Sequence, residues 1–183
     1  MSVTPDLDAA FRAAALAEGL VDVRHDIVDS PVGRLQIGWS TRGLCRISYT
    51  EEGFEEALAD VFGARVLRAP IDDVRRELDE YFERRRTSFD LPLDLRVAPF
   101  PADVLRELAL VPYGTTDTYG ALARRAGRAG AARAVGTVMN RNPIPIVLPC
   151  HRIVGSNGSL TGYAGGLEAK RRLLELEGAT LPG

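Results

Sequence analysis

The sequence predicts an α/β domain with an antiparallel strand meander, followed by a mostly helical domain that contains a helix-turn-helix. Three observations predict this. Alternating apolar positions mark successive strands over residues 23–49. Apolar residues recur at helical spacing through most of the second half. The charge balance also changes sign: residues 1–95 carry 12 basic and 19 acidic residues (−7), whereas residues 96–183 carry 11 and 6 (+5).

The first half opens with helical spacing over residues 6–18, within an N-terminal extension that we take as residues 1–22. Three strands are expected next, separated by turn clusters, at residues 23–28, 34–40 and 44–49. Apolar stripes then predict two amphipathic helices, at residues 55–62 and 71–82. Pro92 indicates that the extended stretch 89–95 is a sheet edge or a linker. We therefore place the domain boundary between residues 95 and 96.

The second half is expected to be mostly helical, with helices at residues 101–110, 119–126, 131–140 and 167–177. Gly127-Arg-Ala-Gly130 separates the middle two helices, which is the helix-turn-helix spacing. An ordinary corner between two helices has the same pattern. The small residues Ala132 and Ala134 would let the second helix approach another surface closely, with Arg133 as the one long side chain of its first turn.

Composition excludes several classes of protein. The chain has two cysteines and two histidines without close ligand spacing, so neither a disulfide scaffold nor a structural zinc site is expected. Charged residues interrupt the N-terminus, which argues against a signal peptide. No apolar run reaches the roughly 20 residues that a membrane span needs. We expect a cytoplasmic protein with free thiols and no membrane contact.

The most unusual segment, residues 142–152, contains three prolines in an apolar run, which forbid a helix and favour an extended chain. Cys150 follows them, with His151 and Arg152 directly after it. An adjacent imidazole and guanidinium would favour the nucleophilic thiolate. The alternative is that Cys150 is a small buried apolar residue. Cys45 lies in an alternating strand and is expected in the core.

Glu177 lies on the last turn of the final predicted helix. It is either a solvated helix end or a carboxylate that hydrogen-bonds a histidine, setting its tautomer and raising its basicity. Five glycines within residues 155–166 either bring the backbone close to a ligand or form a mobile loop.

Taken together, six motifs resemble the active-site region of the O6-alkylguanine-DNA alkyltransferases. They are Val111-Pro-Tyr-Gly114, Tyr119-Gly-Ala-Leu122, Ala132-Arg-Ala-Val-Gly136, Pro149-Cys-His-Arg152, Ile153-Val-Gly-Ser-Asn-Gly158 and Gly162-Tyr-Ala-Gly-Gly-Leu167. Ser30-Pro-Val-Gly33, Gly43-Leu44 and Tyr81-Phe82 resemble the family's first domain more loosely. The resemblance implies a ribonuclease-H-like domain over residues 23–95 and a winged-helix-like DNA-binding and alkyl-transfer domain over residues 96–183.

The implied function is direct-reversal DNA repair by a monomer that uses no cofactor or metal. An alkyl group on O6 of guanine, or on O4 of thymine, in double-stranded DNA would pass irreversibly to Cys150, once per molecule. His151 would deprotonate the thiol through a water, and Glu177 would orient His151. Tyr119 would hydrogen-bond N3 of the flipped guanine. Asn142 would be the hinge that fixes the turn before the active-site strand.

The resemblance also implies residues for binding DNA and the flipped base. Arg133 would fill the gap left in the base stack, while Ala132 and Ala134 lie against the minor groove. Tyr119 and Arg152 complete the expected DNA-binding set. The expected base-binding set comprises Tyr119, Tyr163, the backbone carbonyls of Cys150 and Ile153, and the backbone N–H of Ala164, which would meet O6.

The sequence departs from the family near residue 100, where Phe100 is followed by Pro101 and Leu105 stands where a Trp is usual. Three alternative functions are compatible with parts of the sequence. They are a lesion-binding alkyltransferase-like protein that has lost the cysteine, a winged-helix regulator, and a Cys-His hydrolase. The presence of Cys150 argues against the first, and an extended chain at residues 150–151 would be a poor geometry for the third.

Overall fold

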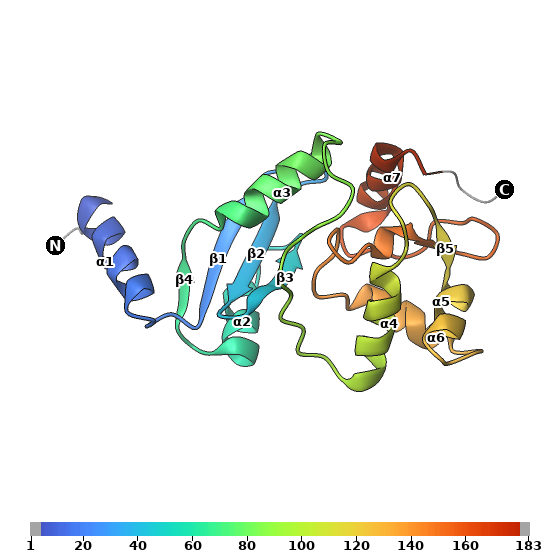
Figure 1. Ribbon diagram of the computed structural model, residues 1–183, viewed down its shortest axis with the longest axis horizontal. Helices are drawn as coiled ribbons and strands as arrows, with labels where there is room; N and C mark the ends of the chain where they lie inside the picture. Colours follow the sequence, from blue (N-terminus) through green and yellow to red (C-terminus); the bar gives the residue numbers. More distant parts are fainter. Residues whose placement is uncertain (1–4, 180–183) are drawn as a thin grey trace.

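The computed structural model of the chain describes residues 5–179; residues 1–4 and 180–183 of the two expected domains lie outside it. Helix α1 lies at one end of the molecule, the sheet with α2 and α3 follows, and the helices of the second half gather at the other end (Figure 1). The elements are α1 (Pro5–Ala17), β1 (Val23–Val28), β2 (Leu35–Ser40), β3 (Gly43–Ser48), α2 (Phe54–Phe62), β4 (Val66–Arg68), α3 (Asp72–Phe82), α4 (Pro99–Ala109), β5 (Asp117–Thr118), α5 (Tyr119–Arg125), α6 (Ala132–Asn140), the 3-10 turn η1 (Cys150–Arg152), β6 (Ile153–Val154) and α7 (Gly166–Glu177).

The four-stranded sheet has the order β3-β2-β1-β4. Strands β1, β2 and β3 pair antiparallel, which confirms the predicted meander. Strand β4 pairs parallel with β1 and was not predicted, because three residues are too few to show an alternation. Cys45 packs with Phe54 and Leu58 of α2, which confirms its expected place in the core. Helix α3 packs its buried face into the other, larger cluster of apolar residues.

The chain from residue 89 to 95 runs along the edge of β3 and leads into the second half. Leu44 N–H donates to the Pro92 carbonyl at 2.8 Å, and Asp94 N–H donates to the Leu44 carbonyl at 2.9 Å. Pro92 has no N–H with which to continue the ladder, so the segment is an edge and linker, as predicted.

Within residues 96–179, the second half has four α-helices, α4 to α7, and one short parallel pair of strands, β5 and β6. Helices α5 and α6 form the predicted helix-turn-helix and contact each other closely. Thr118 caps α5, because its side chain accepts a hydrogen bond from Ala121 N–H at 3.2 Å. No helix within residues 5–179 has the length and apolar character needed to cross a membrane.

One apolar cluster joins the two halves. It includes Ile47 and Tyr81 from the first half and Leu105, Leu122 and Ile146 from the second, all nearly or fully buried. Leu105, at the position where the family usually has Trp, is only 1% exposed and keeps α4 anchored in this core. The shared core fixes the sheet against the helices, so residues of both halves can meet at one site.

Candidate active site

The loop before Cys150 is held by Asn142. The Asn142 amide donates to the Leu148 carbonyl at 2.8 Å, while its oxygen accepts from Ile144 N–H at 3.1 Å. Ile146, fully buried in this loop, has a φ of +77°, a strained value for a β-branched residue. Asn142 therefore connects two points of a tightly constrained loop through its side chain.

The extended chain expected at residues 150–151 is wrong. Cys150–Arg152 form one turn of 3-10 helix, in which Arg152 N–H donates to the Pro149 carbonyl at 2.9 Å. A proline is tolerated just before such a turn, because its missing N–H would have no partner there. With three residues per turn, the 3-10 turn spreads consecutive side chains about 120° apart around its axis, whereas a strand would point them alternately to two opposite faces.

The Cys150 thiol lies in a closed site and is only 3% exposed. Burial raises the pKa of Cys150 to about 11, although a hydrogen bond from the Asn142 side chain and the positive charge of Lys170 oppose this rise. The cation that lowers the pKa is thus Lys170, and not Arg152 as the sequence suggested. The resting cysteine is a protonated thiol at neutral pH and needs a base.

His151, the expected base, forms a buried pair with Glu177. Nε2 of His151 lies 2.8 Å from Oε1 of Glu177, and neither side chain is exposed. Burial opposes ionisation of Glu177, but hydrogen bonds from His151 and Arg152 outweigh it and lower its pKa to about 2. An ionised carboxylate can only accept, so His151 Nε2 carries the proton that it donates to Glu177.

This tautomer leaves Nδ1 of His151 unprotonated. Nδ1 is buried and has no hydrogen-bond partner within the described part of the chain. Burial lowers the pKa of His151, which keeps the imidazole neutral at pH 7. A neutral imidazole whose far nitrogen is held by a carboxylate is the form that accepts a proton, either directly or through a water.

Arg152 has a different place from the one expected. Its guanidinium donates to both oxygens of Glu177 at 2.9 Å and to the Val111 carbonyl at 2.6 Å. The side chain is buried and its donors are engaged, so the expectation that Arg152 binds DNA is corrected to a role as a buried partner of Glu177. Adjacency in sequence was misleading, because the guanidinium of Arg152 is directed to Glu177 and the Val111 carbonyl.

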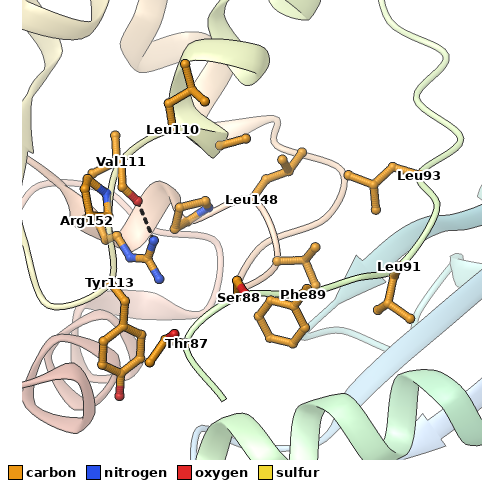
Figure 2. Close-up of a pocket in the computed structure, with 14 residues that line it drawn as sticks. Thr87, Ser88, Phe89, Leu91, Leu93, Leu110, Val111, Tyr113, Leu148 and Arg152 are labelled. Atoms are coloured by element: carbon orange, nitrogen blue, oxygen red, sulfur yellow. Dashed lines mark hydrogen bonds between the residues drawn. The ribbon is translucent and has the colours of Figure 1, made fainter.

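Arg152 also lines a largely apolar cavity of about 730 Å³ between the two halves (Figure 2). Phe89 and Leu91 line one side, and Leu110 and Val111 line the other. Neither Cys150 nor His151 lines this cavity. It is therefore a gap in the packing between the halves, separate from the reactive thiol.

Two tyrosines of the first half brace the site, and their roles were not predicted. Tyr81 of α3 is fully buried and donates its hydroxyl hydrogen to Oε1 of Glu177 at 2.7 Å. Tyr49 shares a hydrogen bond with Tyr163, with their hydroxyl oxygens 2.9 Å apart, and the Tyr163 ring stands edge-on to His151. A Cβ at Gly165 would lie 2.7 Å from the Tyr49 ring, so only glycine fits there.

Lys170, the single lysine of the chain, is the other group that sequence reasoning missed. Its ammonium donates to the Ile153 carbonyl at 2.5 Å and to the Thr161 carbonyl at 2.8 Å, and burial lowers its pKa to about 8. A signal was present in the sequence. Lys170 and Glu177 lie on the same buried stripe of α7 as Leu173 and Leu174, and charged residues on an apolar stripe are rare unless paired.

A hollow of about 350 Å³ on the helix-turn-helix side brings together Tyr119, Ala132 and Arg133 with Asn140 and Thr161. The Tyr119 hydroxyl accepts a hydrogen bond from the Thr161 hydroxyl at 3.0 Å. The Arg133 guanidinium is exposed and has no hydrogen bond or ion pair among residues 5–179. This hollow holds a positive side chain beside an aromatic one, which suits a nucleic-acid surface.

The remaining residues of the expected DNA-binding and base-binding sets differ in their exposure. Ala134 is exposed on α6, Ile153 and Tyr163 are buried, and Ala164 is exposed and lines a neighbouring hollow together with Asn142. The carbonyl of Ile153 accepts from Lys170, and that of Cys150 accepts from Ile153 N–H. Since a carbonyl oxygen has two lone pairs, each could still accept a hydrogen bond from a ligand.

A buried thiol beside a carboxylate-held imidazole, next to a helix-turn-helix, defines a class: proteins that bind nucleic acid and act through a cysteine nucleophile. A family model described as the DNA binding domain of 6-O-methylguanine DNA methyltransferase matches residues 99–179, and its ribonuclease-like domain matches residues 23–95. The chain belongs to the O6-methylguanine DNA methyltransferase family, and both the resemblance and the fold class are confirmed.

Individual relatives agree. The methylated-DNA–protein-cysteine methyltransferase of Mycolicibacterium paratuberculosis is 39% identical over 156 residues, which cover 85% of this chain and 92% of that protein. The protein of the same name from Methanosarcina mazei is 46% identical over 153 residues, with 84% and 96% covered. The crystal structure of Mycobacterium tuberculosis OGT in complex with DNA has a TM-score of 0.76 at 38% identity, covering 85% of this chain and 92% of that one.

We expect Tyr81→Phe to act on the reaction through Glu177. Loss of the hydroxyl leaves Oε1 of Glu177 with fewer donors, so the carboxylate becomes more basic and the pKa of His151 rises. The acid limb of the rate–pH profile should therefore move to higher pH. The free energy of unfolding should fall by about 2 kcal/mol, as for a lost buried hydrogen bond to a charged group. Single-turnover rates between pH 5 and 8, with urea unfolding, measure both.

Tyr113→Phe is the matched control. The Tyr113 hydroxyl donates to the Leu176 carbonyl at 3.3 Å in the same cluster and makes no hydrogen bond to Glu177. Its removal should leave the rate–pH profile unchanged. If Tyr81→Phe lowered stability but left the profile where it is in the unmodified protein, Tyr81 would only support the fold.

Proposed function

We propose that this chain repairs DNA by direct reversal, transferring the alkyl group of O6-alkylguanine, and of O4-alkylthymine, to Cys150. The observation that carries the proposal is the buried Cys150 next to the His151–Glu177 pair, in a chain of this family. No cofactor enters the proposed reaction.

The proposed transfer is a nucleophilic substitution on the alkyl carbon. His151 Nδ1 takes the thiol proton through a water, and the thiolate attacks the carbon bound to O6. The sulfur–carbon bond forms as the carbon–O6 bond breaks. The electron pair leaves with the guanine, which takes up one proton to become ordinary guanine. Because the thioether has no route back to a thiol, each molecule reacts once.

Transfer requires the damaged nucleotide to leave the stack, which costs a few kcal/mol. In the proposal Arg133 fills the gap, and Ala132 and Ala134 let α6 approach the minor groove. Tyr119 donates a hydrogen bond to N3 of the flipped base. The Cys150 and Ile153 carbonyls accept from its amino group, the Ala164 N–H meets O6, and Tyr163 lines the base site.

The proposal assigns DNA binding and transfer to residues 96–183, and the supporting α/β domain to residues 1–95. The hollow that holds Tyr119 and Arg133 supports the first assignment. We further propose a cytoplasmic monomer, since Cys45 and Cys150 are both free thiols, which suits a reducing compartment.

The stoichiometry of transfer tests the proposal. The protein is incubated with an excess of duplex DNA that carries a radiolabelled O6-methylguanine, and protein-bound label is counted over time. We expect the label to reach one methyl group per chain and then stop. Continued loss of methyl groups from DNA without protein-bound label would indicate a hydrolase. Tight binding to the lesion with no label would indicate a lesion-binding protein.

Arg133→Ala should slow transfer from duplex DNA about 10-fold, equivalent to about 1.4 kcal/mol of lost stabilisation of the flipped state. Transfer from the free base O6-methylguanine, which needs no flipping, should be unchanged. The measurement is the single-turnover rate at saturating duplex, compared with the rate on the free base.

Arg124→Ala on the neighbouring helix α5 removes the same charge and is the matched control. It should leave the saturated rate on duplex unchanged. Equal slowing by the two substitutions would mean that Arg133 acts through its positive charge and not by filling the gap in the base stack.

A further inference from the structure

A second hollow, of about 230 Å³, lies beside the active site where the two halves meet. Arg46 of β3 lines it from the first half, and Arg141, directly after α6, lines it from the second. Asn140, Asn142 and Ala164 are among the other residues that line this hollow. The hollow therefore joins an arginine of the sheet to the end of the helix expected to contact DNA.

Among the described residues, the charges of these two arginines are not neutralised by a neighbouring carboxylate. Most arginines of the described chain contact a carboxylate, as Arg75 does with Asp26 and Arg125 does with Glu107. Within residues 5–179, no hydrogen bond or ion pair engages the guanidinium of Arg46 or Arg141, and no Asp or Glu lines their hollow. Two guanidinium groups around one polar hollow suit a phosphate, whose oxygens match the planar fork of arginine.

The position of this hollow relative to the thiol is fixed. Ile47 N–H donates to the Pro143 carbonyl at 2.8 Å, which ties β3 to the loop that Asn142 holds. Asn140 lines both this hollow and the one that contains Tyr119 and Arg133. An anion held here would therefore lie directly beside the place where a flipped nucleotide enters.

We propose that Arg46 and Arg141 bind one backbone phosphate of the DNA strand that carries the lesion. The first half of the chain then contributes directly to DNA binding, alongside the helix-turn-helix. The inference deepens the proposed function and rests on it, because it assumes that DNA lies along α6. It predicts a contact that is independent of base sequence and sensitive to salt.

The test is the salt dependence of binding to a duplex, with or without a lesion. Each phosphate contact contributes about 0.9 to the slope of log Kd against log salt concentration. Because the two arginines share one phosphate, we expect Arg46→Gln and Arg141→Gln each to lower this slope, and the double substitution to lower it by about 0.9. Arg68→Gln is the matched control, because Arg68 lies on β4 at the opposite edge of the sheet and its guanidinium has no hydrogen bond or ion pair in the described chain.

Thermal unfolding of each variant checks the fold, and the rate on free O6-methylguanine should equal that of the unmodified protein. A slope for Arg46→Gln equal to that of the unmodified protein would overturn the inference, as would an equal loss for Arg68→Gln. Binding to undamaged duplex needs no chemistry. A reduced slope in a protein that transfers no methyl group would therefore support the phosphate site while refuting the proposed function.

Discussion

Replacing Cys150 by alanine is expected to abolish alkyl transfer completely. The substitution removes the sulfur that forms the new bond to carbon in the proposed reaction. The Asn142 side chain and the Lys170 ammonium lower the pKa of this thiol. In the proposed reaction neither of them accepts the alkyl group. The measurement is protein-bound label after incubation with labelled O6-methylguanine in duplex DNA, and the expected value is zero at all times.

Cys45→Ala is the matched control for this result. Cys45 is equally buried, but it lies on β3 and packs against α2, and burial raises the pKa of its thiol to about 12. The variant should transfer one methyl group per chain. Cys150→Ala should still bind the duplex with unchanged affinity, because the thiol is only 3% exposed. Residual transfer by Cys150→Ala would mean that another residue is the acceptor.

His151→Ala is expected to lower the single-turnover rate by about 10²- to 10⁴-fold, the usual contribution of a general base. The thiol has a pKa of about 11, so very little thiolate exists at pH 7 without a base. Glu177→Gln should cause a smaller loss, because the amide still orients the imidazole but cannot stabilise its positive charge. DNA affinity should be unchanged in both variants.

The pH dependence of this defect has a definite sign. Raising the pH toward 11 generates thiolate by itself, so a base becomes less necessary. The ratio of the unmodified rate to the His151→Ala rate should therefore fall steadily between pH 7 and pH 10. A ratio that stays constant over this range would mean that His151 does not act by deprotonating Cys150.

Much of the fold could be predicted because its signals are local. The alternation of β1 to β3 and the apolar stripes of α3 and α7 are visible within a few residues. Strands β4, β5 and β6 have only two or three residues each and form no pattern. Their existence depends on pairing between distant parts of the chain.

The same distinction applies to the site. Cys150, His151 and Glu177 were predicted from motifs, and the structure brings the last two into contact. The contact of Tyr81 with Glu177 joins residues 96 positions apart, so no local pattern could reveal it. Arg152 was misplaced because the chain at residues 150–152 is a turn rather than a strand, and the turn directs its guanidinium to Glu177.

Mass spectrometry of proteolytic peptides, after reaction with duplex DNA that contains O6-methylguanine, tests the central claim most directly. A methyl group that replaces the thiol hydrogen adds about 14 Da. We predict this gain on the peptide that contains Cys150, at one group per chain, with the Cys45 peptide unchanged. An unmodified Cys150 peptide after the DNA has lost its methyl group, or the added mass on any other residue, would contradict the mechanism.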